Sequence, residues 1–434
     1  WRIPAGGRPD LVSALARLYG RWAERIDAAN QEAVRRIDEG VPFLTGIAPA
    51  RDVVPGVEAR TVLHCGPALE WPAFCDPLRR SVRAAVIAEG WAATPEQAEQ
   101  LVARGGVRLE PANDHDTVVP MASAIGPSSP VLVVDNERGQ NRAFSPLNQG
   151  SGQVAWFGVE SSEAVDRLVW LRDVAAPVLA ATLRSSGPVD LFALVSQGVQ
   201  MGDDVHMRTQ ATTNLLLRHW LPHLVAVDSP HLAAVAQFLS SNHLFFLNLA
   251  MAGAKAVADW AGKVPESSIV VSMARNGTTF GIRTGGLGSR WFLAPAPAVS
   301  QGLYYPGQGP QTSAPDIGDS AVLELVGLGG PAAAASPAVA SFVGGSMSDA
   351  ITTTRTMDRI CVGQSTRFKL PLLDFRGTPI AVDVRRVVEL EITPAINTGI
   401  LHVSAGSGQV GAGVARAPLQ CFQEAALALD AMFD

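Results

Sequence analysis

The sequence predicts a multi-domain α+β protein in which two mixed sheet-containing parts flank a helical module of about 100 residues. Three observations lead to this prediction. The chain has 434 residues, of which 47% are hydrophobic, enough for a substantial core and for two or three domains. Residues 163–262 carry four successive helical patterns, and β-rich runs stand on both sides of them.

The N-terminal elements follow from spacing and turn residues. Residues 1–60 predict a helical connector: a Pro/Gly-rich opening is followed by apolar residues at helical spacing up to Gly40. Residues 61–162 predict a mixed domain with a short strand at "ARTVLHC" and a helix from Asp76. A second helix, a Gly-Gly stop and further strands complete it, the strands lying at "PVLVVDNERGQNRAFSPLNQG".

After residue 162 the sequence pattern changes first from mixed to helical and then from helical to β-rich. Residues 163–262 form the expected helical module, and residues 263–434 predict a β-rich mixed domain with glycine-rich loops and one Ala/Gly-rich helical stretch near 321–343. An Asn276-Gly277 pair between two β-rich runs is the strongest short hairpin signal. No solenoid repeat is visible.

Composition narrows the classes of partner. The formal net charge is −6 and no run of Lys and Arg occurs, which argues against a nucleic-acid surface or an anionic membrane. Four cysteines without CxxC spacing predict reduced thiols and a cytoplasmic location. The longest apolar stretch is broken by Lys255, so no membrane span is expected. A chain that begins at Trp1 leads us to expect a further segment upstream.

The hairpin "SMARNGTTFGIR" supports two interpretations. The Asn276-Gly277 turn needs no ligand. A guanidinium beside successive turn amides is also how proteins bind an oxyanion, which makes Arg275, Asn276 and Gly277 a candidate anion grip.

Two further clusters contain histidine. His115, between Asp114 and Asp116, is a candidate general acid or base, with a solvated turn as the alternative. Its spacing does not favour a metal site. Asp203, Asp204, His206 and Arg208 stand at a break between helices, where they would either cap a helix or orient a substrate amide.

Two motifs carry no functional prediction, whereas one amide within an apolar run does. "QSTRF" runs on as a strand rather than opening a helix, so its likeness to a carbamoyltransferase phosphate loop is taken as coincidence. "GSGQVG" lacks the helix of a dinucleotide fingerprint, and no cofactor is expected. Asn248 lies inside an apolar run and is either a structural bridge or a site lining.

Several stretches together resemble the YlbE-like family, whose AllG members are subunits of oxamate carbamoyltransferase in anaerobic allantoin breakdown. The resemblance covers nearly the whole chain from about residue 60. It runs through "NDHDTVVPMAS", "PVLVVDNERGQNRAFSPLNQG", "ALVSQGVQMGDDVHMR", "FFLNLAMAGAKA", "SMARNGTTFGIRTGGLGSRWFLAPA", "PDIGDSAVLELVGLGG" and "INTGILHVSAGSGQVGAGVARAPLQCF".

The resemblance implies carbamoyl transfer between carbamoyl phosphate and oxamate, with oxalurate as the carbamoylated product. It also implies an oligomer that includes an FdrA-like subunit and a further small subunit. Such a reaction needs anion-binding groups, a donor to the carbamoyl oxygen and a proton acceptor. An amidohydrolase on a ureido compound and a non-catalytic scaffold subunit are the alternatives.

The residues that we match to these needs are of three kinds. Anion binding is assigned to the Arg275 turn and, as a second clamp or a mere surface turn, to Arg142 beside Asn141. Proton transfer is assigned to His115 or His206, and substrate amide contacts to Asn248 and Asp203. No metal is expected.

Overall fold

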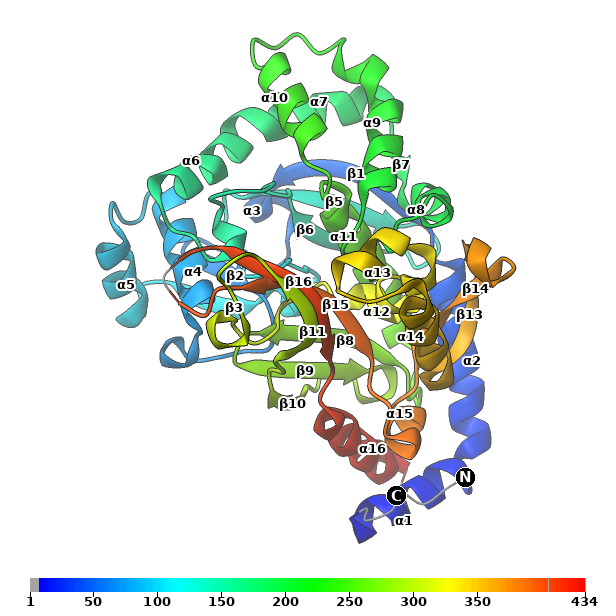
Figure 1. The fold of residues 1–434 in the computed structure, drawn as a ribbon. Helices are drawn as coiled ribbons and strands as arrows, with labels where there is room; N and C mark the ends of the chain where they lie inside the picture. Colours follow the sequence, from blue (N-terminus) through cyan, green and yellow to red (C-terminus); the bar gives the residue numbers. More distant parts are fainter. Residues whose placement is uncertain (1–7, 405, 434) are drawn as a thin grey trace.

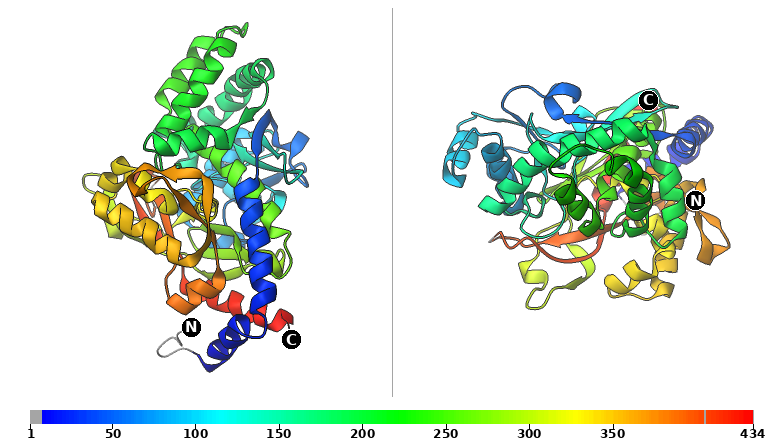
Figure 2. Two further views of the ribbon diagram at one scale, coloured as in Figure 1. Left: turned by 90° about the vertical axis from the view of Figure 1, so that its right-hand side faces the viewer. Right: turned by 90° about the horizontal axis from the view of Figure 1, so that it is seen from above.

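The structure, a computed structural model, describes residues 8–404 and 406–433 and is a mixture of helices with five separate sheets (Figure 1). This confirms the predicted α+β class. At the N-terminus lie α1 (Pro9–Tyr19) and α2 (Ala23–Glu39), at the expected place. α1 packs on the C-terminal helix α16 (Leu419–Phe433), whereas α2 runs beside β13 (Cys361–Leu370) and β14 (Arg376–Val382), as the side view in Figure 2 shows.

The first half of the chain forms two sheets. One is antiparallel, in the order β6-β5-β1-β7, and its strand β1 comes from the segment expected to be a helical connector. The other has the order β3-β2-β4, with β2 and β3 parallel. The elements are β1 (Pro42–Pro49), α3 (Ala50–Val53), β2 (Thr61–His64), α4 (Asp76–Ala88), α5 (Pro95–Ala103), β3 (Arg108–Pro111), β4 (Ala124–Ile125), β5 (Pro130–Asn136), β6 (Asn141–Pro146) and β7 (Val189–Asp190).

The helical region projects at the top of Figure 1, and its last helix is the central one of the molecule. Of the 17 residues of α11 (Phe246–Gly262), 14 are buried, and this helix packs against β5, β6, α2 and β8 (Val270–Asn276). Among the described residues no single helix is long and apolar enough to cross a membrane; α10 and α11 pass that test only together, across a 75° bend. The helices are α6 (Ser162–Trp170), α7 (Ala176–Ser186), α8 (Leu191–Gln200), α9 (Gln210–Leu224), α10 (Leu232–Ser241) and α11 (Phe246–Gly262).

The second half contains the predicted hairpin. β8 and β9 pair antiparallel, and Gly277 in the turn between them has φ 78°, in the left-handed region that favours glycine; Asn276 is the last residue of β8. The sheets have the orders β10-β9-β8-β12, β11-β16-β15 and β13-β14. The elements are β8 (Val270–Asn276), β9 (Thr279–Thr284), β10 (Phe292–Pro295), β11 (Val299–Tyr304), β12 (Ile317–Gly318), α12 (Val322–Leu325), α13 (Pro337–Phe342), α14 (Met347–Ile360), α15 (Val384–Leu390), β15 (Ala395–Leu401) and β16 (Gln409–Arg416).

The hydrophobic core crosses the segment boundaries expected from the sequence. Its larger cluster contains residues from Ala33 to Leu401, with α11 in the middle. A second cluster joins α1 and α2 to strands and helices from Val270 onward. Distant segments are therefore held in fixed positions around α11, and this places side chains from different parts of the sequence around one cavity.

Candidate functional site

A cavity of about 500 Å³ lies where the start of α11 meets the loop after β6, the segment after α8, and strands β15 and β16. That volume suits a small-molecule ligand. Its walls are mainly apolar, with a few hydroxyl, amide and imidazole groups. The lining residues are Pro120, Met121, Ser151, Gly152, Gln153, Trp156, Phe157, His206, Met207, His243, Leu244, Leu247, Tyr305, Ser320, Phe342, Thr398, Gly399, Ser407, Gln409 and Ala412.

His206 reaches the cavity from a tight turn that Asp204 organises. Oδ1 of Asp204 accepts hydrogen bonds from the backbone amides of His206 and Arg208 at 3.2 and 2.8 Å. The side-chain amide of Asn397 donates to Oδ2 of Asp204 at 2.7 Å. Val205 sits in this turn at φ 60°, a costly conformation for a β-branched residue. The hydrogen bonds to Asp204 stabilise this strained backbone, so the turn fixes the orientation of the His206 imidazole.

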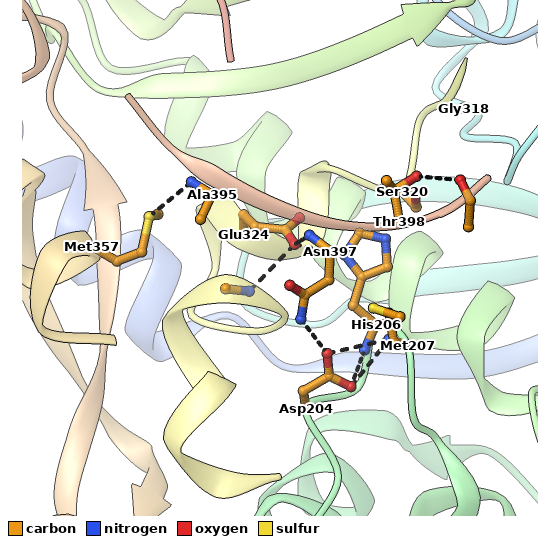
Figure 3. Close-up of polar contacts among 12 residues, drawn as sticks. Asp204, His206, Met207, Gly318, Ser320, Glu324, Met357, Ala395, Asn397 and Thr398 are labelled. Atoms are coloured by element: carbon orange, nitrogen blue, oxygen red, sulfur yellow. Dashed lines mark hydrogen bonds and ion pairs between the residues drawn. The ribbon is translucent and has the colours of Figure 1, made fainter. Parts of the chain in front are cut away.

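His206 forms a buried pair with Glu324, which α12 carries (Figure 3). Nδ1 of His206 lies 2.6 Å from Oε1 of Glu324, which also accepts the backbone N–H of Asn397 at 3.2 Å. Burial raises the pKa of Glu324, while His206 opposes that shift. With Nδ1 engaged by the carboxylate, Nε2 is the nitrogen left for the cavity. The pair therefore has the geometry of an oriented general acid or base.

Two hydroxyl side chains line the cavity together with His206, and the buried guanidinium of Arg275 contacts both of them from the protein interior. Ser320 and Thr398 line the cavity, and Arg275 is fully buried. Its guanidinium binds Asp316 at 2.7 and 3.0 Å, donates to the carbonyl of Gly318 at 2.7 Å, and lies 3.4 Å from both hydroxyls. All five of its N–H donors thus have protein partners. Direct contact of Arg275 with an anion stays a prediction, and the geometry favours a positioning role.

The tip of the hairpin is likewise occupied by protein. Oδ1 of Asn276 accepts the amides of Thr278 and Thr279, and its Nδ2 donates to the carbonyl of Pro67. The amide of Gly277 donates to the carbonyl of Asp316 at 3.2 Å. A Cβ at Gly277 would lie 2.5 Å from Sγ of Cys75. These contacts account for the Asn-Gly pair as a structural turn.

Asp203 takes the capping role that the sequence left open. Its carboxylate accepts the amides of Ala211 and Thr212 at 3.1 and 2.8 Å, at the start of α9. It also binds Arg208 at 2.5 Å. Burial raises the pKa of Asp203, and the amides oppose the shift. The side chain fixes the segment that carries His206 without lining the cavity.

Asn248 acts as a structural bridge. Its Oδ1 accepts from Asn148 at 2.9 Å and its Nδ2 donates to the carbonyl of Pro146 at 2.7 Å. Oδ1 of Asn148 in turn accepts the amide of Gly150 and the side chain of Asn242. This amide chain anchors the loop that supplies Ser151, Gly152 and Gln153 to the cavity wall.

The remaining predicted residues lie elsewhere. Nε2 of His115 is 2.5 Å from Oε2 of Glu110, and its Nδ1 is 2.7 Å from the carbonyl of Pro55. Arg142 makes a half-exposed ion pair with Asp135 at 2.6 Å, and Asn141 donates to the carbonyl of Ala256 at 2.8 Å. Asn141 and Arg142 border a different pocket of about 560 Å³. None of the three joins His206 at the cavity.

The sequence did not single out Glu324, Ser320 or Thr398. A signal for the first existed, because a carboxylate inside "AVLELVG" is a charge in an apolar run and must find a partner when buried. Within the described ranges no group of three or more His, Cys, Asp and Glu side chains is arranged to hold a metal ion.

Comparison with known proteins gives three findings. Residues 107–320 match the family described as "AllG: Oxamate carbamoyltransferase subunit AllG". The chain is 41% identical over 406 residues, 92% of its length and 97% of the relative's, to "Oxamate carbamoyltransferase subunit AllG" of Escherichia coli (strain K12). It is 36% identical over 430 residues, 98% of its length and 91% of the relative's, to "Uncharacterized protein YahG" of the same strain.

A solved structure is also similar, titled "Crystal structure of a conserved protein of unknown function from Enterococcus faecalis V583". The TM-score is 0.93 and the sequence identity 36%, and the match covers 95% of this chain and 99% of the other. The fold is thus shared over nearly the full length of both chains.

Proposed function

The chain belongs to the AllG family of oxamate carbamoyltransferase subunits, and we propose that it carries the acid–base centre of such an enzyme. The proposed reaction transfers a carbamoyl group between carbamoyl phosphate and oxamate, in the breakdown of allantoin-derived ureides in the cytoplasm. The observation that supports it most is the buried His206–Glu324 pair, with its free imidazole nitrogen on a cavity of small-molecule size.

In the transfer direction the amide nitrogen of oxamate attacks the carbamoyl carbon, a C–N bond forms, and the C–O bond to phosphate breaks. The amide nitrogen must lose a proton, and Nε2 of His206 is the acceptor that the geometry offers. Glu324 stabilises the imidazolium that results. The reverse direction is phosphorolysis of oxalurate, in which the imidazolium returns the proton.

The reaction also requires a hydrogen-bond donor to the carbamoyl oxygen, and the hydroxyl groups that line the cavity are the candidates. The hydroxyl of Ser320 can donate to the carbamoyl oxygen as charge develops on it. Arg275 lies 3.4 Å from the hydroxyls of Ser320 and Thr398, and the Thr398 hydroxyl donates to Asp316 at 2.8 Å. In this proposal Arg275 is a positioning residue, and its effect reaches the substrate through Ser320.

The cavity suggests that this chain works with partners. No lysine or arginine stands among the described residues that line it, yet a dianionic phosphate needs cationic or amide contacts. We propose that the FdrA-like subunit and the further small subunit of the complex contribute them.

The assembled complex provides the test. Carbamoyl phosphate formation from oxalurate and phosphate is measured with the parent chain and with His206→Gln, and assembly is followed by size-exclusion chromatography. We expect a loss of about 100-fold or more with assembly unchanged. Full activity of the variant would refute the acid–base role and support a scaffold function. Release of carbamate, which breaks down to ammonia and carbon dioxide, without dependence on phosphate would favour an amidohydrolase.

A further inference from the structure

The mouth of the His206 cavity is formed by exposed residues from distant segments of the chain. Among the described residues that line the cavity, those that are exposed are Ser151, Gly152, Gln153, His243, Tyr305, Phe342 and Ser407. None of them is Asp, Glu, Lys or Arg, although such residues make up 17% of the chain. Charged residues are common on solvated surfaces and depleted at the centre of protein–protein contacts, where aromatic residues are enriched. The mouth therefore has the composition of a contact surface.

An apolar patch continues the mouth along β11 and α13. The side chains of Leu303, Tyr305 and Phe342 are 48%, 44% and 46% exposed, and we call these three residues the mouth patch. The amide of Tyr305 donates to the carbonyl of Val410 at 2.8 Å, which extends the pairing of β11 with β16, so Leu303 and Tyr305 project from the same side. A Cβ at Gly344 would lie 3.2 Å from Cδ2 of Leu303. The end of α13 thus lies against β11, and the patch is continuous.

The proposed substrate indicates what this surface has to receive. Carbamoyl phosphate carries a dianionic phosphate, which needs cationic or amide contacts. Arg275 is fully buried, and Asp316 and the carbonyl of Gly318 already bind its guanidinium. The described lining of the cavity contains no lysine or arginine. A positive charge that reaches the phosphate must therefore enter through the mouth.

This inference rests on the proposed function, because it names the partner of the same cavity. We infer that the mouth patch is the docking surface of a different chain, which covers the mouth and places a lysine or arginine side chain over the bound phosphate. Covering the mouth also excludes water, which strengthens the interactions between charges in the cavity. A second copy of this chain fits less well, because a twofold contact would place the mouth patch against itself and bring no cation.

Photocrosslinking in the assembled complex tests the location of this surface. A benzophenone-bearing phenylalanine replaces Phe342 and, as the matched control, Phe375, which is 59% exposed in the turn between β13 and β14. Position 342 should cross-link to a different chain, position 375 should not, and mass spectrometry identifies the cross-linked peptide. Replacing the lysine or arginine of that peptide with methionine should raise the KM for phosphate in oxalurate phosphorolysis at least about 10-fold, with assembly intact.

Charged variants test the energetic contribution of the patch. Phe342→Asp and Tyr305→Asp place a carboxylate in the contact, so the dissociation constant of the complex should rise at least about 10-fold. Phe375→Asp is the same exchange outside the patch and should leave assembly unchanged. Because all three side chains are exposed in this chain, thermal unfolding of the variant chains should match that of the parent chain.

Two results would overturn the inference: a cross-link from position 342 to a second copy of this chain, or normal assembly of both Phe342→Asp and Tyr305→Asp without a cross-link to another chain. An unchanged KM for phosphate after replacement of every lysine and arginine in the cross-linked peptide would remove the cation from it. Full activity of His206→Gln together with dissociation of Phe342→Asp would count against the proposed function alone. Inactive His206→Gln with normal assembly of the patch variants would count against the docking surface alone.

Discussion

The protein contains the same two kinds of side-chain pair, histidine with glutamate and arginine with aspartate, in two different environments. Around the His206 cavity lie His206–Glu324 and Arg275–Asp316, and all four side chains are buried. On the face that includes β3 and β6 lie His115–Glu110 and Arg142–Asp135, which are partly exposed. The distances are similar, 2.5 to 2.7 Å, so burial is the main difference between the two sets. A contact distance alone therefore does not separate a buried pair from a surface pair.

The largest expected difference between the two environments is in the unfolding free energy that is lost when the arginine of each pair is replaced. Arg275→Met leaves Asp316 charged and without its partner in the interior, which costs about 3–5 kcal/mol of unfolding free energy. Arg142→Met removes a half-exposed pair with Asp135, which costs about 1 kcal/mol or less. Chemical denaturation of both variants measures the difference. Equal losses would contradict the comparison, whereas partial recovery in Arg275→Met with Asp316→Leu would sharpen it.

The second difference concerns catalysis. Glu324→Gln keeps the shape of the side chain but removes the charge that stabilises the imidazolium, so turnover by the assembled complex should fall about 100-fold, which equals about 2.7 kcal/mol. Glu110→Gln is the matched change beside His115 and should leave turnover within about twofold. The readout is the dependence of kcat on pH as well as its size, because a merely structural effect would not shift the profile. A parallel loss in both variants would remove the distinction between the pairs.

The difference between local patterns and long-range contacts explains which features could be predicted from the sequence. The helices between residues 162 and 262 and the β8–β9 hairpin follow local patterns, and the structure contains both. The two histidines were selected because Asp114, Asp116, Asp203 and Asp204 stand next to them, but their actual partners are Glu110 and Glu324. Glu324 is 118 residues away from His206, and no periodicity reports such a distance.

Burial was harder to predict than secondary structure. Arg275 was predicted to bind an anion at the hairpin turn, whereas in the structure it is fully buried, which arginine rarely is without a partner. Its partner Asp316 is 41 residues further along the chain, on the segment before β12. The pairing of β8 with β12 brings the two residues together. Only long-range sheet pairing thus places this residue inside the molecule.

The smallest expected difference concerns the pH dependence of stability. Burial raises the pKa of Asp319, which accepts the amides of Gly66 and Val119, to about 7. In the unfolded chain the pKa of an aspartate is near its ordinary value of about 3.9. The folded state therefore binds a proton that the unfolded state releases, and stability decreases as the pH rises between these two values. Between pH 6 and pH 8 the loss is about 1.4 kcal/mol.

Asp135, on the exposed face, should behave in the opposite sense. Burial tends to raise its pKa, but hydrogen bonds from Arg142 and Thr45 lower it overall, so its contribution is present at neutral pH and is lost only as the pH falls through its folded pKa. Unfolding free energies of the parent protein, Asp319→Asn and Asp135→Asn, measured from about pH 2 to pH 8, test both signs, because the Asp135 contribution is lost only below the ordinary aspartate pKa of about 3.9. Asp319→Asn lowers stability overall, because an amide cannot accept from both backbone N–H groups, but it should flatten the slope above pH 6. Asp135→Asn should leave that slope unchanged, and a slope that Asp319→Asn also leaves unchanged would show that the buried carboxylate is already ionised.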